Sequence, residues 1–531
     1  MGIIEAILDR ASVKSVLTFA IGALVVRHIV LRWHERNRIR RLGERGKSLE
    51  TLVPWGLDFI YSAVTATANH KNLEWWHDMF SKAGRWTLET RAVNQRLIMT
   101  ADPENIKAIL ATQFSDFGKG EPFHRDWQDF LGDSIFTTDG MMWQNSRQLI
   151  RPQFTRDRVS DLECFEQHMG TLFRAIANGG PLDGANQAVS CSANGKVLDI
   201  ADLFFRYTLD VATEFLLGGD VQSLTTIDQE FAKAFNDVQR LQNILARSGD
   251  LRPWIPKASF WNGLTVMNEF VNHFVDMALR LKPEQLQNSK SSKQYTFLHA
   301  VVGTTRDRKV LRDQIVAVLL AGRDTTASTL SWAMYELARH PECVAKLRRE
   351  ILETVGADSL PTYDHLKNMP YLKAVINETL RLYPVVPFNV RLALKDTTLP
   401  RGGGADGTEP LAVLKDTPIT YSTLVMQRRP DLYPAPSAEF AHSDMFSPER
   451  WERWHPRPHE YIPFNAGPRI CIGQQFALTE MSYVLVRLFQ RFDLVESHMG
   501  PIDGGKPVLK AEIVLSPGQG VHLSFHEALK S

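Results

Sequence analysis

Residues 464–473 read Phe464-Asn465-Ala466-Gly467-Pro468-Arg469-Ile470-Cys471-Ile472-Gly473, and a run of good helix formers follows from Gln474 to Glu480. The two glycines permit close approach of another group to the backbone, because they lack a Cβ. A thiol at the start of a helix lies near free N–H groups and the positive end of the helix dipole, and both favour the thiolate. The stretch therefore predicts a loop that presents Cys471 to a bound group and then opens a helix.

The fixed positions of this stretch follow the spacing Phe-x-x-Gly-x-Arg-x-Cys-x-Gly. A lone cysteine is more often a buried structural residue, but here all the fixed positions are filled together. The spacing resembles the haem-binding motif of the cytochromes P-450. The resemblance implies that Cys471 is the axial thiolate ligand of a haem b iron and that Arg469 contacts a haem propionate. It also implies that Phe464 packs beside the sulfur and that Gly473 lets the cofactor pack against the main chain.

Length and composition are those of a globular protein. The chain has 531 residues, 44% of them hydrophobic and 23% charged, with a formal net charge of +1. A charge so close to zero gives no general attraction for nucleic acid, so we expect no nucleic-acid partner. The four cysteines, Cys164, Cys191, Cys343 and Cys471, are too few and scattered for a disulfide framework, and they fit a reducing compartment. The resemblance implies a mainly α fold with a small β region (α+β), the cytochrome P-450 fold.

The N-terminal segment departs from this average composition. Val16 to Val26 is eleven residues without a charge, and seven basic residues follow between 32 and 47. A membrane span needs about 20 apolar residues, and a basic cluster marks its cytoplasmic flank. We expect residues 1–31 to be a single-pass anchor in the endoplasmic reticulum membrane, 32–50 a basic linker and 51–531 a cytosolic haem-thiolate catalytic domain. An interfacial helix is the alternative, and acidic residues before the apolar run disfavour a cleaved signal peptide.

A second segment, residues 52–68 with their aromatic side chains, fits either contact with the bilayer surface or an ordinary packing helix.

A buried helix is predicted between residues 313 and 340. Its run Ile315 to Leu320 is apolar on every side, and Ala321-Gly322-Arg323-Asp324-Thr325-Thr326 follows. Glycine costs a helix roughly 1 kcal/mol of stability relative to alanine, and a buried carboxylate costs more unless it is paired. Gly322 and Asp324 occurring together in a buried helix therefore suggest a functional site, and the alternative is a polar helix end that faces solvent. This run resembles the oxygen-activation motif of the same family. The resemblance implies that Thr325 bonds the oxygen being activated or its water, and that Asp324 relays protons.

Further residues take their expected roles from the resemblance. Trp143 and Arg147, four positions apart, share a helix face, and the family implies that they bind a propionate. Glu378 and Arg381, a commonplace surface pair by themselves, are implied to form a buried structural network with Arg450. The remaining implied contacts are a haem propionate for Arg391 and the lining of the substrate cavity for Ala321, Val385, Val386 and Phe388.

The resemblance narrows to the fungal alkane- and fatty-acid-hydroxylating P-450s, through residues 111–114, 151–154, 311–314, 321–327 and 474–480. It implies a monooxygenase that uses O2 to hydroxylate a hydrophobic substrate, a long-chain fatty acid or n-alkane at or near its terminal carbon. Electrons would come from NADPH through NADPH–cytochrome P-450 reductase, with cytochrome b5 as a second possible donor.

Three alternatives stay open: an oxidase tailoring a specialised metabolite, a reductase-independent haem-thiolate isomerase, and a non-catalytic haem or lipid carrier. The intact Asp324-Thr325 pair speaks against the last two, because neither needs a proton relay.

Overall fold

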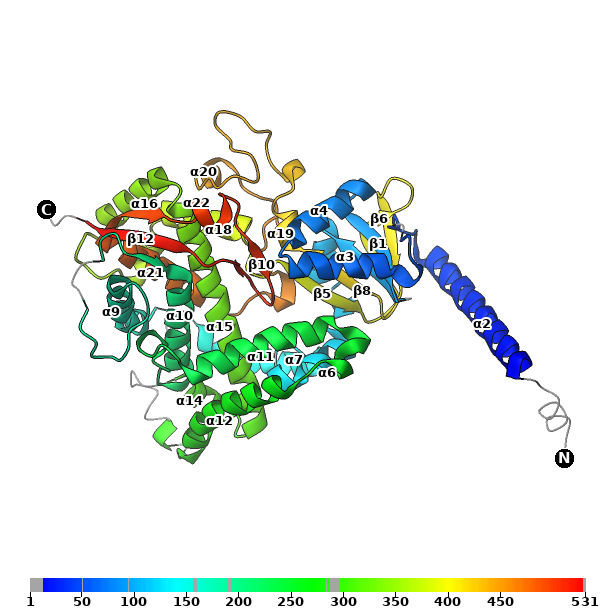
Figure 1. Cartoon of the computed structure of the whole chain (residues 1–531), viewed down its shortest axis with the longest axis horizontal. Helices are drawn as coiled ribbons and strands as arrows, with labels where there is room; N and C mark the ends of the chain where they lie inside the picture. Colours follow the sequence, from blue (N-terminus) through cyan, green and yellow to red (C-terminus); the bar gives the residue numbers. More distant parts are fainter. Residues whose placement is uncertain are drawn as a thin grey trace.

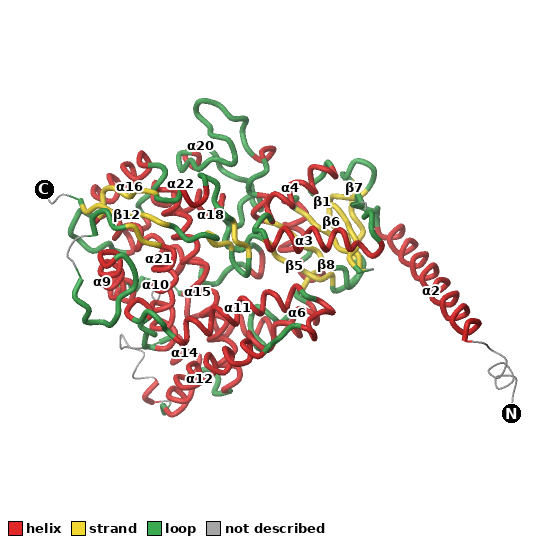
Figure 2. Tube along the Cα trace, in the orientation of Figure 1, coloured by secondary structure: helices red, strands yellow, loops and turns green. Residues whose placement is uncertain are grey.

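The structure is a computed structural model. It describes residues 13–49, 51–93, 95–155, 160–189, 193–282, 284–286 and 296–528, so the first twelve residues of the expected anchor lie outside it. Helices make up most of the molecule, and most of the strands gather in two places, one beside α3 and α4 and one around β12, with a short pair between them (Figure 2). The expected mainly α fold with a small β region is confirmed.

The helices are α2 (Val13–Leu42), α3 (Leu57–Ala68), α4 (Asn72–Ala83), α5 (Pro103–Lys107), α6 (Gly120–Leu131), α7 (Gly140–Ile150), α9 (Glu163–Asn178), α10 (Ile200–Leu217), α11 (Glu230–Arg247), α12 (Ala258–Arg280), α14 (Phe297–Val302), α15 (Arg308–Leu337), α16 (Pro341–Thr354), α17 (Tyr363–Lys367), α18 (Pro370–Leu382), α19 (Thr423–Met426), α20 (Arg450–Arg453), α21 (Gln474–Arg491) and α22 (Gly500–Asp503).

The strands are β1 (Thr87–Ala92), β2 (Gln95–Thr100), β3 (Phe117–Gly118), β4 (Val197–Asp199), β5 (Phe388–Ala393), β6 (Thr397–Gly403), β7 (Glu409–Val413), β8 (Pro418–Ser422), β9 (Phe492–Ser497), β10 (Leu509–Ala511), β11 (Leu515–Pro517) and β12 (His522–Glu527). One sheet has the order β1-β2-β8-β5-β3, in which only the β2–β8 pair is parallel, with Ile98 opposite Ile419. A second sheet, β4-β12-β9, lies near the C-terminus, and β6-β7 and β10-β11 are two-stranded.

The long helix α15 crosses the middle of the molecule beside α10 (Figure 1). Asp307 caps its start, since the carboxylate accepts hydrogen bonds from the backbone N–H groups of Lys309 (2.9 Å) and Val310 (3.2 Å). The apolar run Ile315–Leu320 is buried except for Val318. The predicted buried helix is therefore confirmed, and it carries the predicted site residues Ala321, Asp324 and Thr325.

Helix α2 projects away from the body at the N-terminal end of the chain (Figure 1). Within the described residues it is the helix long and apolar enough to cross a membrane, with a mean hydropathy of 1.6 over a window of which none is buried. Its last turns dock on the strands, because Ile39 is buried against Ala412 and Leu414. The expected boundary at residue 31 falls inside this helix, and beyond its end Glu44 and Gly46 form β-bridges to the strands.

Three short sequence patterns elsewhere predict local structure. Asp102-Pro103-Glu104 is typical of a helix start, which the cap of α5 confirms, and residues 398–408 predict a hairpin connection, which joins β6 to β7. The strand-like alternation over 419–426 predicts a strand, and this is wrong in its second half, where 423–426 form α19. The helix forms because the Ser422 hydroxyl accepts a hydrogen bond from the Val425 N–H (3.1 Å) and caps a new helical turn.

Candidate functional site

The loop 464–473 is held in shape by backbone contacts. Gly467 has φ +66°, and a Cβ there would lie 1.8 Å from the carbonyl oxygen of Leu110, so any other residue would be both strained and excluded. The Cys471 N–H donates to the Phe464 carbonyl at 2.9 Å, which closes the loop. Helix α21 then begins at Gln474, as the sequence predicts.

Cys471 has an exposed side chain, yet burial by the surrounding protein raises the pKa of its thiol, with the Gly473 N–H and Arg147 opposing the shift. The Cys471 sulfur is therefore accessible to solvent and at the same time surrounded by protein on most sides. The expectation that the helix start favours the thiolate is therefore wrong for the protein alone, because desolvation outweighs the helix N–H groups. A metal ion reverses this balance, since coordination deprotonates a thiol outright, and the thiol fits the role of a metal ligand.

A cluster of buried positive charge lies beside the loop. Arg469, Arg391 and Lys119 act on one another, and like charge from Arg391 and Arg469 adds to desolvation to lower the pKa of Lys119 well below its usual range. Burial lowers the pKa of Arg469 to about 10, and the like charges of Arg391 and Arg147 add to this effect. Asp139 is the carboxylate that opposes both shifts, and its Oδ1 accepts from Arg469 Nη2 at 2.6 Å.

The charge in this cluster does not balance within the protein. The cations Lys119, Arg147, Arg391 and Arg469 face the single carboxylate Asp139 among the groups that act on Lys119 and Arg469. With Lys119 protonated, the net charge of about +3 would fall to about +1 with the two propionates of a haem, and those propionates would favour the protonated lysine. The buried Nε of Arg469 also has no hydrogen-bond partner in the described part of the chain. Both observations fit a dianionic ligand.

The predicted pair on α7 lies against the loop. The Arg469 guanidinium sits 4.7 Å from the centroid of the Trp143 ring, and Arg147 Nη1 donates to the Ile470 carbonyl at 3.1 Å. Arg391 lies on β5 and is held by Asn389 Oδ1 (3.0 Å), which Lys119 Nζ also approaches (3.2 Å). The structure thus brings together four of the predicted cofactor-binding residues: Trp143, Arg147, Arg391 and Arg469.

Sequence reasoning missed Lys119 and Asp139. The Asp139 carboxylate accepts from the N–H groups of Lys119 (2.9 Å) and Gly120 (2.7 Å), and so fixes the turn that carries the lysine. A lysine between two glycines looks like a surface loop in the sequence, and nothing in the one-dimensional pattern marks it as desolvated. Only the fold brings it to Arg391 and Arg469.

One stripe of α15 is open while the rest of its middle is buried. Val318, Ala321, Gly322 and Thr325 are partly exposed, whereas their neighbours 319, 320, 323 and 324 are buried. The positions i, i+3, i+4 and i+7 lie on one face of a helix, so solvent reaches this face of α15 between buried neighbours. Thr325 Oγ1 donates to the Ala321 carbonyl at 2.7 Å, a bond to the carbonyl four residues earlier that a helical threonine can form and that can loosen a helix. The helix nevertheless continues unbroken from Arg308 to Leu337.

Asp324 points to a different neighbour from Thr325. It is buried, lies 3.3 Å from Arg323, and receives a hydrogen bond from Gln239 on α11. Burial raises its pKa, and the charge of Arg323 and the Gln239 bond oppose the rise. The carboxyl is thus held close to α11, one residue along the helix from the open stripe.

The expected structural network is assembled at the end of α18. Arg381 binds the Glu378 carboxylate through Nε (2.7 Å) and Nη2 (2.8 Å), and Arg450 Nε lies 3.3 Å from the same carboxylate. All three side chains are fully buried. The Ser447 N–H (3.0 Å) and Trp451 Nε1 (3.1 Å) donate to the same carboxylate, and the Trp451 ring contacts Tyr461 (centroids 4.7 Å apart), which leads into the Cys471 loop.

The residues predicted to line a substrate cavity are placed unequally. Val386 is 39% exposed, whereas Val385 is buried. Phe388 stacks on Trp76 of α4, with ring centroids 5.2 Å apart, and so is engaged in packing. Ala321 lies on the open stripe of α15, and Phe464 packs against a hydrophobic core cluster. Gly473 caps α21 with ordinary backbone angles, and a Cβ there would meet only Phe154 at 3.7 Å.

Comparison with known proteins gives concordant results. A family model described as Cytochrome P450 matches residues 58–520. The chain is 59% identical to cytochrome P450 monooxygenase pvhE of Talaromyces variabilis over 530 residues, 99% of this chain and 98% of that protein. It is 40% identical to cytochrome P450 52A13 of Debaryomyces hansenii, covering 84% of this chain and 85% of that one. The crystal structure of the cytochrome P450DA heme domain superposes with a TM-score of 0.73 at 20% identity, covering 92% of this chain and 99% of that one.

Proposed function

The chain belongs to the cytochrome P450 family and is a monooxygenase of it, and we propose that it hydroxylates a C–H bond of an apolar specialised metabolite at the membrane. The observation that carries the choice of substrate class is the lower identity to P450 52A13, which we take to represent the alkane- and fatty-acid-hydroxylating group that the sequence resembles. That identity is 40%, against 59% for the relative named pvhE, which matches nearly end to end. Pocket side chains change more readily between relatives than cofactor-binding ones, so the resemblance to P450 52A13 gives weak support for a fatty acid or alkane.

The family implies a haem-thiolate cofactor, and we assign it as haem b. When bound, the haem supplies the redox chemistry that puts one atom of O2 into a C–H bond and releases the other as water. Cys471 Sγ would ligate its iron. Lys119, Arg391 and Arg469 would hold the propionates, because charge-assisted hydrogen bonds offset the desolvation of these carboxylates. The Trp143 indole covers Arg469 and keeps its guanidinium in place.

The chain's own part in the chemistry is to position a substrate and to deliver protons. The open stripe of α15 offers Val318, Ala321 and Gly322 as a small apolar surface, which suits an apolar substrate. The Thr325 hydroxyl donates a hydrogen bond to the Ala321 carbonyl. Its oxygen lone pairs can therefore accept a hydrogen bond from a water on the open face. Asp324 would hold the proton to be delivered, since burial raises its pKa.

Partners and location follow from the same proposal. Electrons would come from NADPH through NADPH–cytochrome P-450 reductase, with cytochrome b5 as a second donor. Helix α2 would anchor the chain in the endoplasmic reticulum membrane, with residues from 51 onward on the cytosolic side. A membrane location supports an apolar substrate, because such molecules dissolve in the bilayer.

Microsomes that contain the chain and the reductase test the proposal. They would be incubated with NADPH, 18O2 and an extract of apolar specialised metabolites, and in parallel with lauric acid, oleic acid and hexadecane. We expect NADPH-dependent incorporation of one 18O atom into an extract component, and little conversion of the two fatty acids and hexadecane. Efficient terminal hydroxylation of these three compounds would instead assign the protein as a lipid hydroxylase, and product formed without NADPH would indicate the isomerase. Microsomes carrying Cys471→Ala are the blank.

A further inference from the structure

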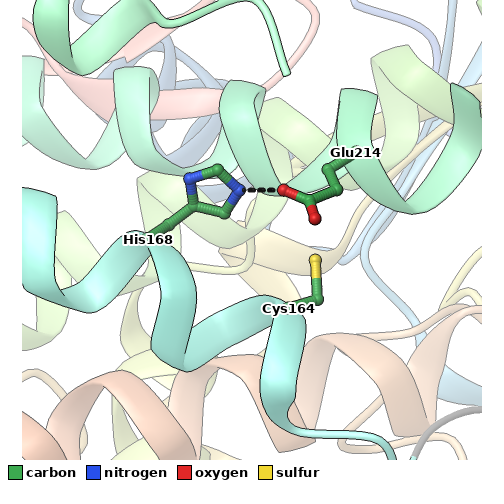
Figure 3. A group of neighbouring side chains, drawn as sticks. All are labelled: Cys164, His168 and Glu214. Atoms are coloured by element: carbon green, nitrogen blue, oxygen red, sulfur yellow. Dashed lines mark hydrogen bonds and ion pairs between the residues drawn. The ribbon is translucent and has the colours of Figure 1, made fainter. Parts of the chain in front are cut away.

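A group of metal-binding side chains lies between α9 and α10, separate from the residues assigned above. Cys164 and His168 are four positions apart on α9 and therefore share a helix face, and Glu214 reaches them from α10. The Cys164 sulfur, a ring nitrogen of His168 and a carboxylate oxygen of Glu214 all lie within 4.8 Å of one another. Figure 3 shows the three side chains converging on one point.

We propose that Cys164, His168 and Glu214 bind a divalent zinc-type metal ion that joins α9 to α10. The set combines a thiolate, an imidazole and a carboxylate, which are the three ligand types that zinc takes in proteins. A sulfur ligand disfavours calcium and magnesium, which take oxygen ligands. Water would complete a tetrahedral site, because Cys164 and Glu214 are only partly buried.

The surroundings of His168 support this assignment. Its ring is almost fully buried, with Nε2 2.7 Å from Glu214 Oε2 and Nδ1 3.8 Å from Asp220 Oδ2. A histidine that binds a metal through one nitrogen usually has its other ring N–H directed at a carboxylate, which fixes the ring. Asp220 is placed for that role, and Asp210 lies on the same side of the ring. Three carboxylates around one imidazole leave an excess of negative charge, which a dication would neutralise.

The competing explanation is a satisfied ion pair between His168 and Glu214 with a neighbouring packed thiol. That pair accounts for one nitrogen and one oxygen, and the Cys164 thiol has only a long contact of 3.9 Å to the Val211 carbonyl. It does not explain why the sulfur lies within 4.8 Å of both partners or why Nδ1 of His168 faces Asp220. Zinc would require the 2.7 Å contact to open, since bonds of about 2.0–2.3 Å to one ion place the donor atoms roughly 3.3–3.8 Å apart. The Cys164 thiol proton would be released on binding.

Haem-loaded full-length protein, stripped of other metals with a chelator, provides the test. It would be titrated with zinc chloride in buffers of fixed free zinc, and the bound ion examined by zinc K-edge X-ray absorption. We expect one zinc per haem, with one sulfur at about 2.3 Å and nitrogen or oxygen neighbours at about 2.0 Å. The thiolate-type carbon monoxide spectrum should stay unchanged, which shows that the zinc has not taken Cys471.

Variants separate the ligands from their surroundings. Cys164→Ser and Glu214→Gln should weaken zinc binding by more than the roughly 10- to 100-fold typical of losing an outer partner, and Asp220→Asn should weaken it within that range. Cys343→Ser, which removes a thiol outside this group, is the matched control and should bind like wild type. Equal affinity in wild type, Cys164→Ser and Glu214→Gln, or an absorption spectrum without sulfur, would overturn the proposal. Glu214→Gln is isosteric, so its result stands even if Cys164→Ser fails to fold.

Discussion

Replacing Arg381 by alanine tests whether the buried network at the end of α18 supports the Cys471 loop. The side chain binds Glu378 twice and also donates to the carbonyl oxygens of Ser443 (2.6 Å) and Met445 (3.1 Å). Burial lowers the pKa of the guanidinium, but the charge and hydrogen bonds of Glu378 outweigh it and hold the pKa above its usual value. Arg381 and Glu378 therefore satisfy each other, and removal of the arginine leaves the Glu378 carboxylate fully buried without its main partner.

The magnitude follows from that carboxylate. Breaking a buried pair by removing one partner typically costs about 3–5 kcal/mol, against a total stability of roughly 5–15 kcal/mol for a domain. Arg450 at 3.3 Å and the Trp451 N–H at 3.1 Å still reach Glu378, so we place the loss near the lower end. Because Trp451 contacts Tyr461 on the way to Cys471, the loss should reach the haem-binding loop.

The assay is the carbon monoxide difference spectrum of the ferrous protein, together with the urea midpoint. We expect Arg381→Ala to give little or no thiolate-type band and a lower midpoint. The control is Arg453→Ala on α20, whose partner Glu439 is exposed and whose ion pair should contribute at most about 1 kcal/mol. A normal band at wild-type yield and an unchanged midpoint in Arg381→Ala would refute the reasoning.

Three more predictions concern single side chains. Thr325→Val should keep the haem spectrum but lower product formed per NADPH roughly 10-fold or more, since the hydroxyl that would accept a hydrogen bond from the proton-carrying water is lost; unchanged coupling, measured as product against NADPH consumed, would exclude that role. Lys119→Gln should lower the haem-to-protein ratio if the cation holds a propionate. Full haem content in a more stable protein would show instead that Lys119 only repels Arg391 and Arg469 and does not bind the haem. Burial raises the pKa of Glu480 to about 8 from an ordinary 4.5, with Thr326 opposing the shift. The folded state then keeps a proton that the unfolded chain releases, so stability falls as pH rises between about 4.5 and 8, by about 1.4 kcal/mol per pKa unit. Glu480→Gln should match wild type in urea midpoint near pH 5 and exceed it at pH 8, and parallel pH profiles would contradict this.

The sequence predicted the parts of the fold that local pattern controls. Unbroken apolarity over 315–320 gave the buried helix α15, and the glycines and helix formers around Cys471 gave the loop and α21. It failed where a few atoms decide between elements, as at 423–426, where one serine hydroxyl caps a helical turn after β8.

The chemistry of the site was predictable only in its residue types. Motif spacing pointed to Arg469, Trp143 and Arg391, which the fold brings together. It could not supply Lys119, whose importance depends on burial beside cations from β5 and the Cys471 loop. For the same reason it gave the wrong sign for the Cys471 thiol, because the degree of desolvation is a property of the packed structure.

These two features of the site have one physical explanation. A cluster of repelling cations costs free energy in the protein alone, and desolvation raises the pKa of the Cys471 thiol, so that the thiolate is disfavoured there. A single ligand with a metal centre and two carboxylates would change both, because the metal stabilises the thiolate and the carboxylates neutralise the cations. Lys119 and Cys471 should therefore be coupled through the haem. In a double-mutant comparison, Lys119→Gln should weaken haem retention in wild type and have almost no effect once Cys471→Ala has removed the axial ligand. Equal losses in both backgrounds would show that the cations and the thiol serve separate purposes.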